Sequence, residues 1–338
     1  MKARRIRYYE FGEPQDVIKV EHALLELPAP GELVVRMLAS PINPSDLIPI
    51  RGSYAHRIML PATPGYEGVG VVEEVGSSVS REWLGRRVLP LRGEGTWQEY
   101  VKAPVEWAVP VPAEIDDYSA AQLYINPITA WVTCTELLRL ARSGKTLLVN
   151  ACGSAIGRIY AQLSQVLGFR LIAVTRSGRH TAELLGLGAE HVICTPTGSL
   201  YEAVMDLTRG RGADAAIDAV GGASGEELAM CVRTGGMFLT IGLLSGEPLN
   251  WASLLQRNPV HAKLFHLRHW NSQIASPAWH ATFRHMMELT GEGRLRLDRP
   301  EAIYELSAVH EAVRTAASGS GGKRMLTMGE LLPGHTSI

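Results

Sequence analysis

The chain has 338 residues, of which 46% are hydrophobic and 20% charged, and its formal net charge at pH 7 is −1. This composition is that of a folded globular protein, and the length suggests about two domains. The near-zero charge, the lack of a long basic run and the lack of an apolar run of about 18 residues argue against nucleic acid, an anionic membrane surface and a membrane span. We therefore expect a small-molecule partner.

The cysteines and the amino terminus indicate a reduced compartment. The four cysteines lie far apart, form no C-x-x-C pair and have no secretory signal ahead of them. The first residues, MKARRIRYYEFGEP, pass directly into a strand-like alternation and a Gly/Pro turn, without a transit peptide or a hydrophobic signal core. We expect a cytoplasmic protein.

The first third of the chain, to about residue 115, predicts a β-rich and loop-rich domain. Its β-branched runs at 17–20, 32–37 and 68–75 are separated by Pro and Gly clusters. From Ser119 the pattern predicts a helix interrupted by Pro127, and then strands that alternate with helices as far as about residue 244. Such alternation is typical of a doubly wound α/β fold with a parallel sheet.

The stretch 146–176 predicts one strand, turn, helix, strand unit of the size of a mononucleotide-binding half. Small residues in its turn would let the backbone approach a pyrophosphate, whose charge the N–H groups and the helix dipole would meet. Gly153, Ser154, Ala155 and Gly157 fit this role, although Cys152 and Ser154 stand where the first two glycines of G-x-G-x-x-G are expected. The alternative is an ordinary βα turn that binds no nucleotide.

The end of the second strand favours NADPH over NADH. The residues Thr175, Arg176, Ser177, Gly178 and Arg179 include no acid that could hold the ribose 2′-OH of NAD. Arg176 and Arg179 could instead pair with a 2′-phosphate through charge-assisted hydrogen bonds. For either arginine the alternative is a solvated surface charge.

Further buried strands are predicted at 190–193, 215–220 and 237–241. Ligands bind at the carboxyl ends of parallel strands, which places Gly242, Leu243 and Leu244 near the cofactor. After about residue 261 we expect mixed helix and loop, a flexible turn at 316–322 and a final strand at 323–328. The later histidines match no compact ligand set, so we expect surface histidines rather than a metal site; they are His261, His266, His269, His280 and His285.

Motifs along the chain resemble the medium-chain dehydrogenase/reductase superfamily over essentially its whole length. They are NPSDLIPIRGSY at 43–54, LPATPGYEGVGVVEEVG at 60–76, GTWQEYV at 95–101, INPITAW at 125–131 and NACGSAIG at 150–157. With the terminal KRMLTM they are similar, more narrowly, to the mitochondrial-type 2-enoyl thioester reductases. The resemblance implies a GroES-like catalytic domain at 1–118, an NADP-binding Rossmann domain at 119–262 and a return to the catalytic domain at 263–338.

The zinc-dependent alcohol dehydrogenases of this superfamily carry a Cys and a His ligand in the two amino-terminal motifs, where this chain has Asn43 and Tyr66. Glu67 remains, but one carboxylate cannot replace a tetrahedral zinc site. The Cys-rich lobe of those enzymes is also missing. The resemblance therefore implies no metal and a reaction without a Lewis acid.

The resemblance assigns the proton donor of an enoyl reductase to Tyr54 of the Gly-x-Tyr element; the alternative is a packing residue with its hydroxyl in water. His266 stands where the family tends to carry Trp, which leaves the shape of the acyl pocket open. From the turn, the strand ends and the resemblance we predict the following cofactor-binding residues: Asn126, Gly153, Ser154, Ala155, Ile156, Gly157, Thr175, Arg176, Ser177, Gly178, Arg179, Ile241, Gly242, Leu243, Leu244, Phe265, His266, Leu267 and Lys323.

Three functions remain open at this point. The first is NADPH-dependent reduction of the C=C bond of 2-enoyl thioesters carried by coenzyme A or acyl carrier protein. The second is a quinone or enone reductase, which needs no acyl channel, and the third is a cofactor-binding protein with little catalysis. The resemblance also implies a homodimer that pairs through an edge strand of the nucleotide domain, for which 237–241 is the candidate.

Overall fold

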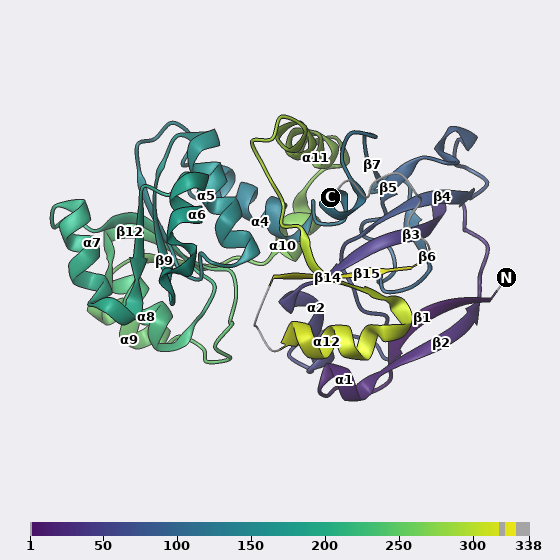
Figure 1. Cartoon of the computed structure of the whole chain (residues 1–338), viewed down its shortest axis with the longest axis horizontal. Coiled ribbons are helices and arrows are strands. Elements are labelled where there is room, and N and C mark those ends of the chain that lie inside the picture. The colour runs from purple at the N-terminus through teal and green to yellow at the C-terminus, as the bar shows by residue number, and fades with distance from the viewer. Residues whose placement is uncertain (1, 318–321, 329–338) are drawn as a thin grey trace. The chain divides into compact units, whose positions relative to one another are not determined.

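The computed structural model describes residues 2–317 and 322–328, and these form two compact units (Figure 1). Unit 1 comprises residues up to 125 together with 275–293 and the stretch from 297 onward, and unit 2 comprises 126–274 and 294–296. Among the described residues no helix is both long and apolar enough to cross a membrane.

Unit 1 is built on β-strands. A two-stranded antiparallel ribbon pairs β1 (Lys2–Tyr8) with β2 (Ile18–Leu24). A seven-stranded sheet follows the order β14-β15-β3-β4-β5-β7, with β6 also paired to β3. Its strands are β3 (Glu32–Ile42), β4 (Val69–Val75), β5 (Arg87–Leu89), β6 (Tyr100–Pro104), β7 (Val109–Pro110), β14 (Pro300–Glu305) and β15 (Lys323–Thr327).

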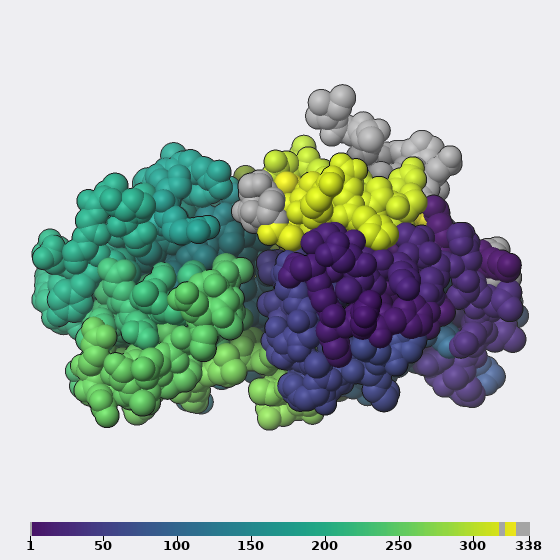
Figure 2. Space-filling model, turned by 90° about the horizontal axis from the view of Figure 1, so that it is seen from below, coloured from purple at the N-terminus to yellow at the C-terminus, as the bar shows by residue number. Residues whose placement is uncertain are grey.

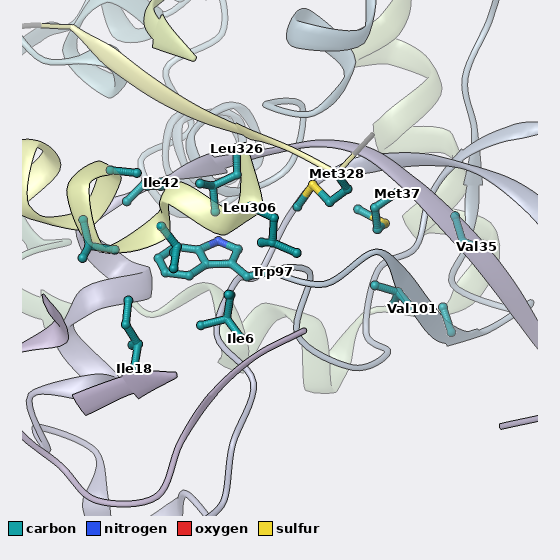
Figure 3. Close-up of a cluster of buried hydrophobic side chains, with 14 of the residues drawn as sticks. Ile6, Ile18, Val35, Met37, Ile42, Trp97, Val101, Leu306, Leu326 and Met328 are labelled. Atoms are coloured by element: carbon teal, nitrogen blue, oxygen red, sulfur yellow. The ribbon is translucent and has the colours of Figure 1, made fainter. Parts of the chain in front are cut away.

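The core of unit 1 surrounds Trp97, which is fully buried. Figure 3 shows its indole among Ile6, Leu306 and Leu326, which come from widely separated parts of the chain. Figure 2 shows the yellow carboxyl-terminal segment against the purple amino-terminal elements, where α12 packs on α1. The helices of this unit are α1 (Pro14–Val17), α2 (Pro44–Ile50), η1 (Ala55–Arg57), η2 (Arg81–Trp83), α3 (Asp117–Ala120), α11 (Ser276–Gly291), η6 (Leu306–Ala308) and α12 (Val309–Ala317).

Unit 2 is a six-stranded sheet in the order β10-β9-β8-β11-β12-β13, and each neighbouring pair is parallel. Helices α5 and α6 lie on one side of it, and α7, α8 and α9 lie on the other (Figure 1). The strands are β8 (Thr146–Val149), β9 (Arg170–Thr175), β10 (His191–Cys194), β11 (Ala213–Asp218), β12 (Val232–Thr240) and β13 (His261–Leu264). The helices are α4 (Ile125–Val132), η3 (Thr133–Leu137), α5 (Ala155–Leu167), η4 (Gly178–His180), α6 (Thr181–Leu187), η5 (Thr195–Thr197), α7 (Leu200–Thr208), α8 (Gly222–Met230), α9 (Trp251–Arg257) and α10 (Leu267–Gln273).

This architecture confirms the predicted α/β fold, with a doubly wound parallel sheet in unit 2 and a β-rich unit 1. The prediction that 237–241 is an edge strand is wrong, because β12 pairs on both sides, with β11 and β13. The predicted interruption at Pro127 is also misplaced. The break precedes Ile125, and Pro127 lies in the first turn of α4. Backbone N–H groups in the first turn of a helix have no acceptor within the helix, so a proline there costs no hydrogen bond. Of the predicted flexible turn at 316–322, residues 318–321 lie outside the described part.

Candidate active site

Residues 150–157, which form the turn between β8 and α5 and the first turn of α5, are called the phosphate cradle here after the role predicted for them. Ala151 adopts a positive φ of 50°, which turns the chain out of the strand. Ser154 is the N-cap of α5, and its hydroxyl oxygen accepts the Gly157 N–H at 3.3 Å. The remaining N–H groups of the first turn and the helix dipole favour an anion at this end of α5.

Gly157 is required by close packing. A Cβ on it would lie 2.4 Å from the Cα of Cys152, whose backbone N–H is bonded to Val174 O in the neighbouring strand β9. Only glycine lets the helix approach the strand so closely. The cradle therefore keeps the one glycine that helix–strand packing needs, while Cys152 and Ser154 stand in place of the other two.

A buried amide–carboxylate pair, which the sequence analysis did not single out, fixes the strand ends around this turn. Asn150 Nδ2 donates to Asp218 Oδ1 at 2.6 Å, and Asn150 Oδ1 accepts the Ala219 N–H at 2.8 Å. The Asp218 carboxylate also accepts the N–H groups of Val220 and Gly221. The ends of β8 and β11 are thus joined by side chains. The signal in the sequence was a polar residue at the end of each buried strand, since Asn150 directly follows β8 and Asp218 is the last residue of β11.

The end of β9 presents the predicted basic residues. Thr175 is buried and donates its hydroxyl to Ser177 O at 3.1 Å, and Ser177 in turn accepts the Arg179 N–H. Arg176 and Arg179 are exposed on this turn. The residues Thr175, Arg176, Ser177, Gly178 and Arg179 therefore share the carboxyl edge of the sheet with the phosphate cradle.

Seven of the other predicted cofactor residues of unit 2 follow neighbouring strands at the same edge. Ile241, Gly242, Leu243 and Leu244 follow β12, with the Ile241 N–H bonded to Asp218 O. Phe265, His266 and Leu267 follow β13, and Asn126 is the second residue of α4. His266 caps α10 by accepting the Arg268 N–H at 3.2 Å on Nδ1, and its pKa is lowered by burial and by the neighbouring His269.

The predicted proton donor, Tyr54, lies in unit 1, half-buried at the start of η1. The guanidinium carbon of Arg57 lies 3.8 Å from the centre of its phenol ring. A cation at this distance stacks on the ring face and restricts its rotation. Arg57 was not anticipated from the sequence, because a basic residue three positions after a tyrosine is not by itself a signal.

A buried polar network lies where the resemblance places two metal-ligand positions. Asn43, Asp46, Glu67 and Lys323 are 2%, 1%, 1% and 8% exposed. The Asn43 side chain donates to Glu67 Oε1 at 2.8 Å and accepts from Lys323 Nζ at 2.7 Å. Glu67 Oε2 accepts the N–H groups of Tyr124 and Ile125. Of these four residues, only Lys323 had been predicted to be functional.

Burial dominates the protonation of this network. It raises the pKa of Asp46 to about 7, although the carboxylate accepts the N–H groups of Asn43 and Tyr66. Burial also raises the pKa of Glu67, and it lowers that of Lys323 against the attraction of Glu67. The Asn43 amide is thus bonded on both sides, to a carboxylate and to an ammonium group. Within residues 2–317 and 322–328, no group of three or more His, Cys, Asp or Glu is placed to hold a metal ion.

Two family models match the chain. Residues 29–113 match the alcohol dehydrogenase GroES-like domain, and residues 155–289 match the zinc-binding dehydrogenase domain. These matched ranges lie within units 1 and 2 and reach into unit 1 again at α11.

Known proteins are similar over most of the chain. A mitochondrial enoyl-[acyl-carrier-protein] reductase from Xenopus tropicalis is 35% identical over 257 residues, which is 74% of this chain and 72% of the relative. The crystal structure of a putative NADPH:quinone reductase from Bacillus thuringiensis is 57% identical, has a TM-score of 0.95 and covers 97% of this chain and 99% of that one. The Etr1p/Etr2p heterodimer of Candida tropicalis, a mitochondrial 2-enoyl thioester reductase, is 25% identical with a TM-score of 0.84, covering 97% and 100%; Etr1p is also known in complex with NADP and crotonyl-CoA.

The sequence identity, the coverage and the two-unit architecture all indicate the same family of proteins. The chain belongs to the medium-chain dehydrogenase/reductase superfamily of nicotinamide-dependent oxidoreductases, in the group of the enoyl thioester reductases and quinone oxidoreductases.

Proposed function

We propose that the protein reduces the C=C bond of 2-enoyl thioesters with NADPH and without zinc. The half-buried phenol of Tyr54, stacked by Arg57, carries this proposal, because it is a proton donor of restricted orientation in the unit that the family uses for catalysis. The identity to an enoyl-[acyl-carrier-protein] reductase supports the same substrate class. The two-sided bonding of Asn43 supports a zinc-free site, since its amide is already committed to Glu67 and Lys323.

The cofactor assignment is supported by the shape and charge of unit 2. The first turn of α5 would hold the diphosphate through its backbone N–H groups, at the end of the helix that Ser154 caps. Arg176 and Arg179 would meet the 2′-phosphate, where an acid would repel it. When bound, the nicotinamide supplies the hydride.

The chain's own residues handle the proton. Hydride addition at the β carbon of an enoyl thioester places negative charge on the carbonyl oxygen, and the α carbon must then take a proton. The Tyr54 hydroxyl donates that proton, and the Arg57 guanidinium over the ring face stabilises the negative charge that the phenol oxygen acquires.

The test is oxidation of NADPH by the purified protein with crotonyl-CoA and longer 2-enoyl-CoA thioesters, followed by the loss of NADPH absorbance. We expect turnover with at least one chain length. A protein that binds NADPH but turns over no thioester of any length would refute the substrate assignment.

Tyr54→Phe tests the proton donor. Loss of a positioned general acid lowers kcat by roughly a hundredfold to ten-thousandfold. The matched control is Tyr9→Phe, because Tyr9 is an exposed phenol of the same unit that bonds Glu21. Full activity of Tyr54→Phe would reject the assignment even if the substrate class held.

A quinone or enone reductase is the second candidate, and the 57% identity to a putative NADPH:quinone reductase favours it. A quinone accepts hydride without an acyl channel and takes its protons readily from water. We therefore compare kcat/KM for a benzoquinone with that for crotonyl-CoA, in the parent and in Tyr54→Phe. Quinone turnover that exceeds thioester turnover and survives this substitution would replace the first proposal with the second.

A homodimer through β13 is part of the proposal. This strand ends the sheet of unit 2, and parallel pairing with β12 occupies only one of its sides. Leu264 at its end is 67% exposed, so a second copy could pair here and cover an apolar side chain. Light scattering on Leu264→Lys should give a monomer where the parent gives a dimer, with Leu27→Lys on an exposed loop of unit 1 as the control. A parent that is monomeric would remove the dimer from the proposal.

A further inference from the structure

His180 covers the phosphate cradle of unit 2. It ends η4, directly after the basic turn of β9, and its side chain is only 18% exposed. A Cβ added to Gly153 would lie 2.6 Å from Cδ2 and 3.0 Å from Nε2 of this imidazole. The imidazole therefore packs against the backbone of Gly153 and also contacts Arg179 in the turn after β9.

The hydrogen bonds of this imidazole indicate which of its two nitrogens carries the proton. Arg179 Nε–H donates to His180 Nε2 at 2.8 Å, so Nε2 must carry a lone pair. The proton of the neutral ring then sits on Nδ1, which lies 3.3 Å from Glu183 Oε2. Arg158 Nη2 lies 3.4 Å from the same Nδ1, a longer approach that a neutral ring accepting from Arg179 cannot also satisfy. His180 thus accepts from one arginine and donates to a carboxylate.

The charges around the ring leave the basic turn positive. Glu183 would repel a phosphate, but its carboxylate is paired with Arg158, which donates to Oε1 from Nε at 2.7 Å and to Oε2 from Nη2 at 3.2 Å. In the described part of the chain, Arg176 and Arg179 form no ion pair, and the side chain of Arg179 bonds only His180. A 2′-phosphate carries roughly 1.5 to 2 negative charges, so the two guanidinium groups of this turn would match its charge.

We propose that His180 is the positioning residue for cofactor discrimination: it holds Nε of Arg179, so that the terminal nitrogens of that guanidinium are left to bind the 2′-phosphate. This inference rests on the proposed NADPH dependence and names the residue on which its selectivity depends. An arginine on an exposed turn would otherwise lose the entropy of several rotatable bonds when it binds the phosphate. The bond to His180 restricts the side chain in advance.

The experiment measures the Kd of NADPH and of NADH by calorimetry, without substrate. In His180→Phe a ring still covers Gly153 but cannot accept from Arg179, and we expect the Kd for NADPH to rise roughly tenfold, or ~1.4 kcal/mol, while that for NADH stays within about twofold. His180→Gln, which keeps an acceptor oxygen at similar reach, should restore most of the NADPH affinity. His191→Phe, on the neighbouring strand β10, is the matched control and should change neither Kd.

Arg179→Ala completes the design. If His180 acts through Arg179, the double variant with His180→Phe binds NADPH no more weakly than Arg179→Ala alone. Equal losses of NADPH and NADH affinity in His180→Phe, or additive losses in the double variant, would overturn the proposal. A parent that does not prefer NADPH would overturn it together with the cofactor assignment, whereas binding preference without thioester turnover would remove only the substrate assignment.

Discussion

Replacing Lys323 by methionine should destabilise unit 1 strongly, and more so at higher pH. The Lys323 ammonium donates to Asn43 and attracts the buried carboxylates of Glu67 and Asp46. Methionine has a similar length and fills the space, so the change removes the charge and little volume.

The magnitude follows from the burial of the partners. Glu67 and Asp46 are each 1% exposed, and without the ammonium no other cation in the described part of the chain is bonded to their network. Breaking a buried ion pair by removing one partner costs about 3–5 kcal/mol, because a charge stays buried without compensation. We expect a loss of this size in the free energy of unfolding at about pH 8, where Asp46 is largely ionised.

The pH dependence has a definite sign. The pKa of Asp46 is raised in the folded state to about 7, so this group contributes stability that is complete at low pH and is lost as the pH rises through that value. Removal of Lys323 takes away an attraction that lowers this pKa, and the Asp46 pKa rises further. The difference in the free energy of unfolding between Lys323→Met and the parent should therefore be smaller at about pH 6 than at about pH 8.

The assay is urea denaturation, followed by circular dichroism and tryptophan fluorescence at both pH values. Lys19→Met, on the exposed strand β2, is the control and should change stability by less than about 0.5 kcal/mol. Adding Glu67→Gln to Lys323→Met removes one of the two buried carboxylates, the one bonded to Asn43. An Asn43 amide freed from Lys323 can turn to accept from the new amide, so we expect recovery of more than half of the loss. A loss below about 1 kcal/mol, or one that is equal at both pH values, would refute the electrostatic account.

Three other outcomes follow from the same geometry. Gly157→Ala places a Cβ 2.4 Å from the Cα of Cys152, so it should destabilise unit 2 by about 1–3 kcal/mol and weaken NADPH binding in titration. Trp97→Ala empties the centre of the unit 1 core and should cost about 3–5 kcal/mol in urea denaturation. Arg57→Gln should lower kcat for thioester reduction by roughly tenfold, and an unchanged kcat would show that the stack on Tyr54 is not needed.

The sequence predicted the elements whose pattern is local. The apolar run of β8, the helical spacing of α5 and the second run of β9 are read within thirty residues, and the structure has all three. The edge of the sheet was assigned to the wrong strand because β13 is a four-residue strand, HAKL, with mostly exposed side chains and no apolar alternation. Its strand conformation comes from pairing with β12, which a local pattern does not reveal.

The same distinction holds for the site. The phosphate cradle and the basic residues after β9 lie on adjacent turns of one βαβ unit, so motif spacing could find them. The network of Asn43, Glu67 and Lys323 joins residues from distant parts of the chain, and a single lysine near the carboxyl end has the same local signature as a surface charge. The His180 contact depends on which side chain accepts a proton, and that information exists only in three dimensions.

The pairing of Lys323 with Asn43 also has a consequence for biosynthesis. The two partners are 280 residues apart. At ribosomal speeds of 5–20 residues per second, roughly 15–55 s pass between the appearance of the asparagine and that of the lysine. Throughout this interval the nascent amino-terminal half holds Asp46 and Glu67 without the Lys323 ammonium, and β3 lacks β15 as a neighbour. The edge of β3 that β15 will cover therefore stays open to pairing with other chains until residues 323–327 have been made.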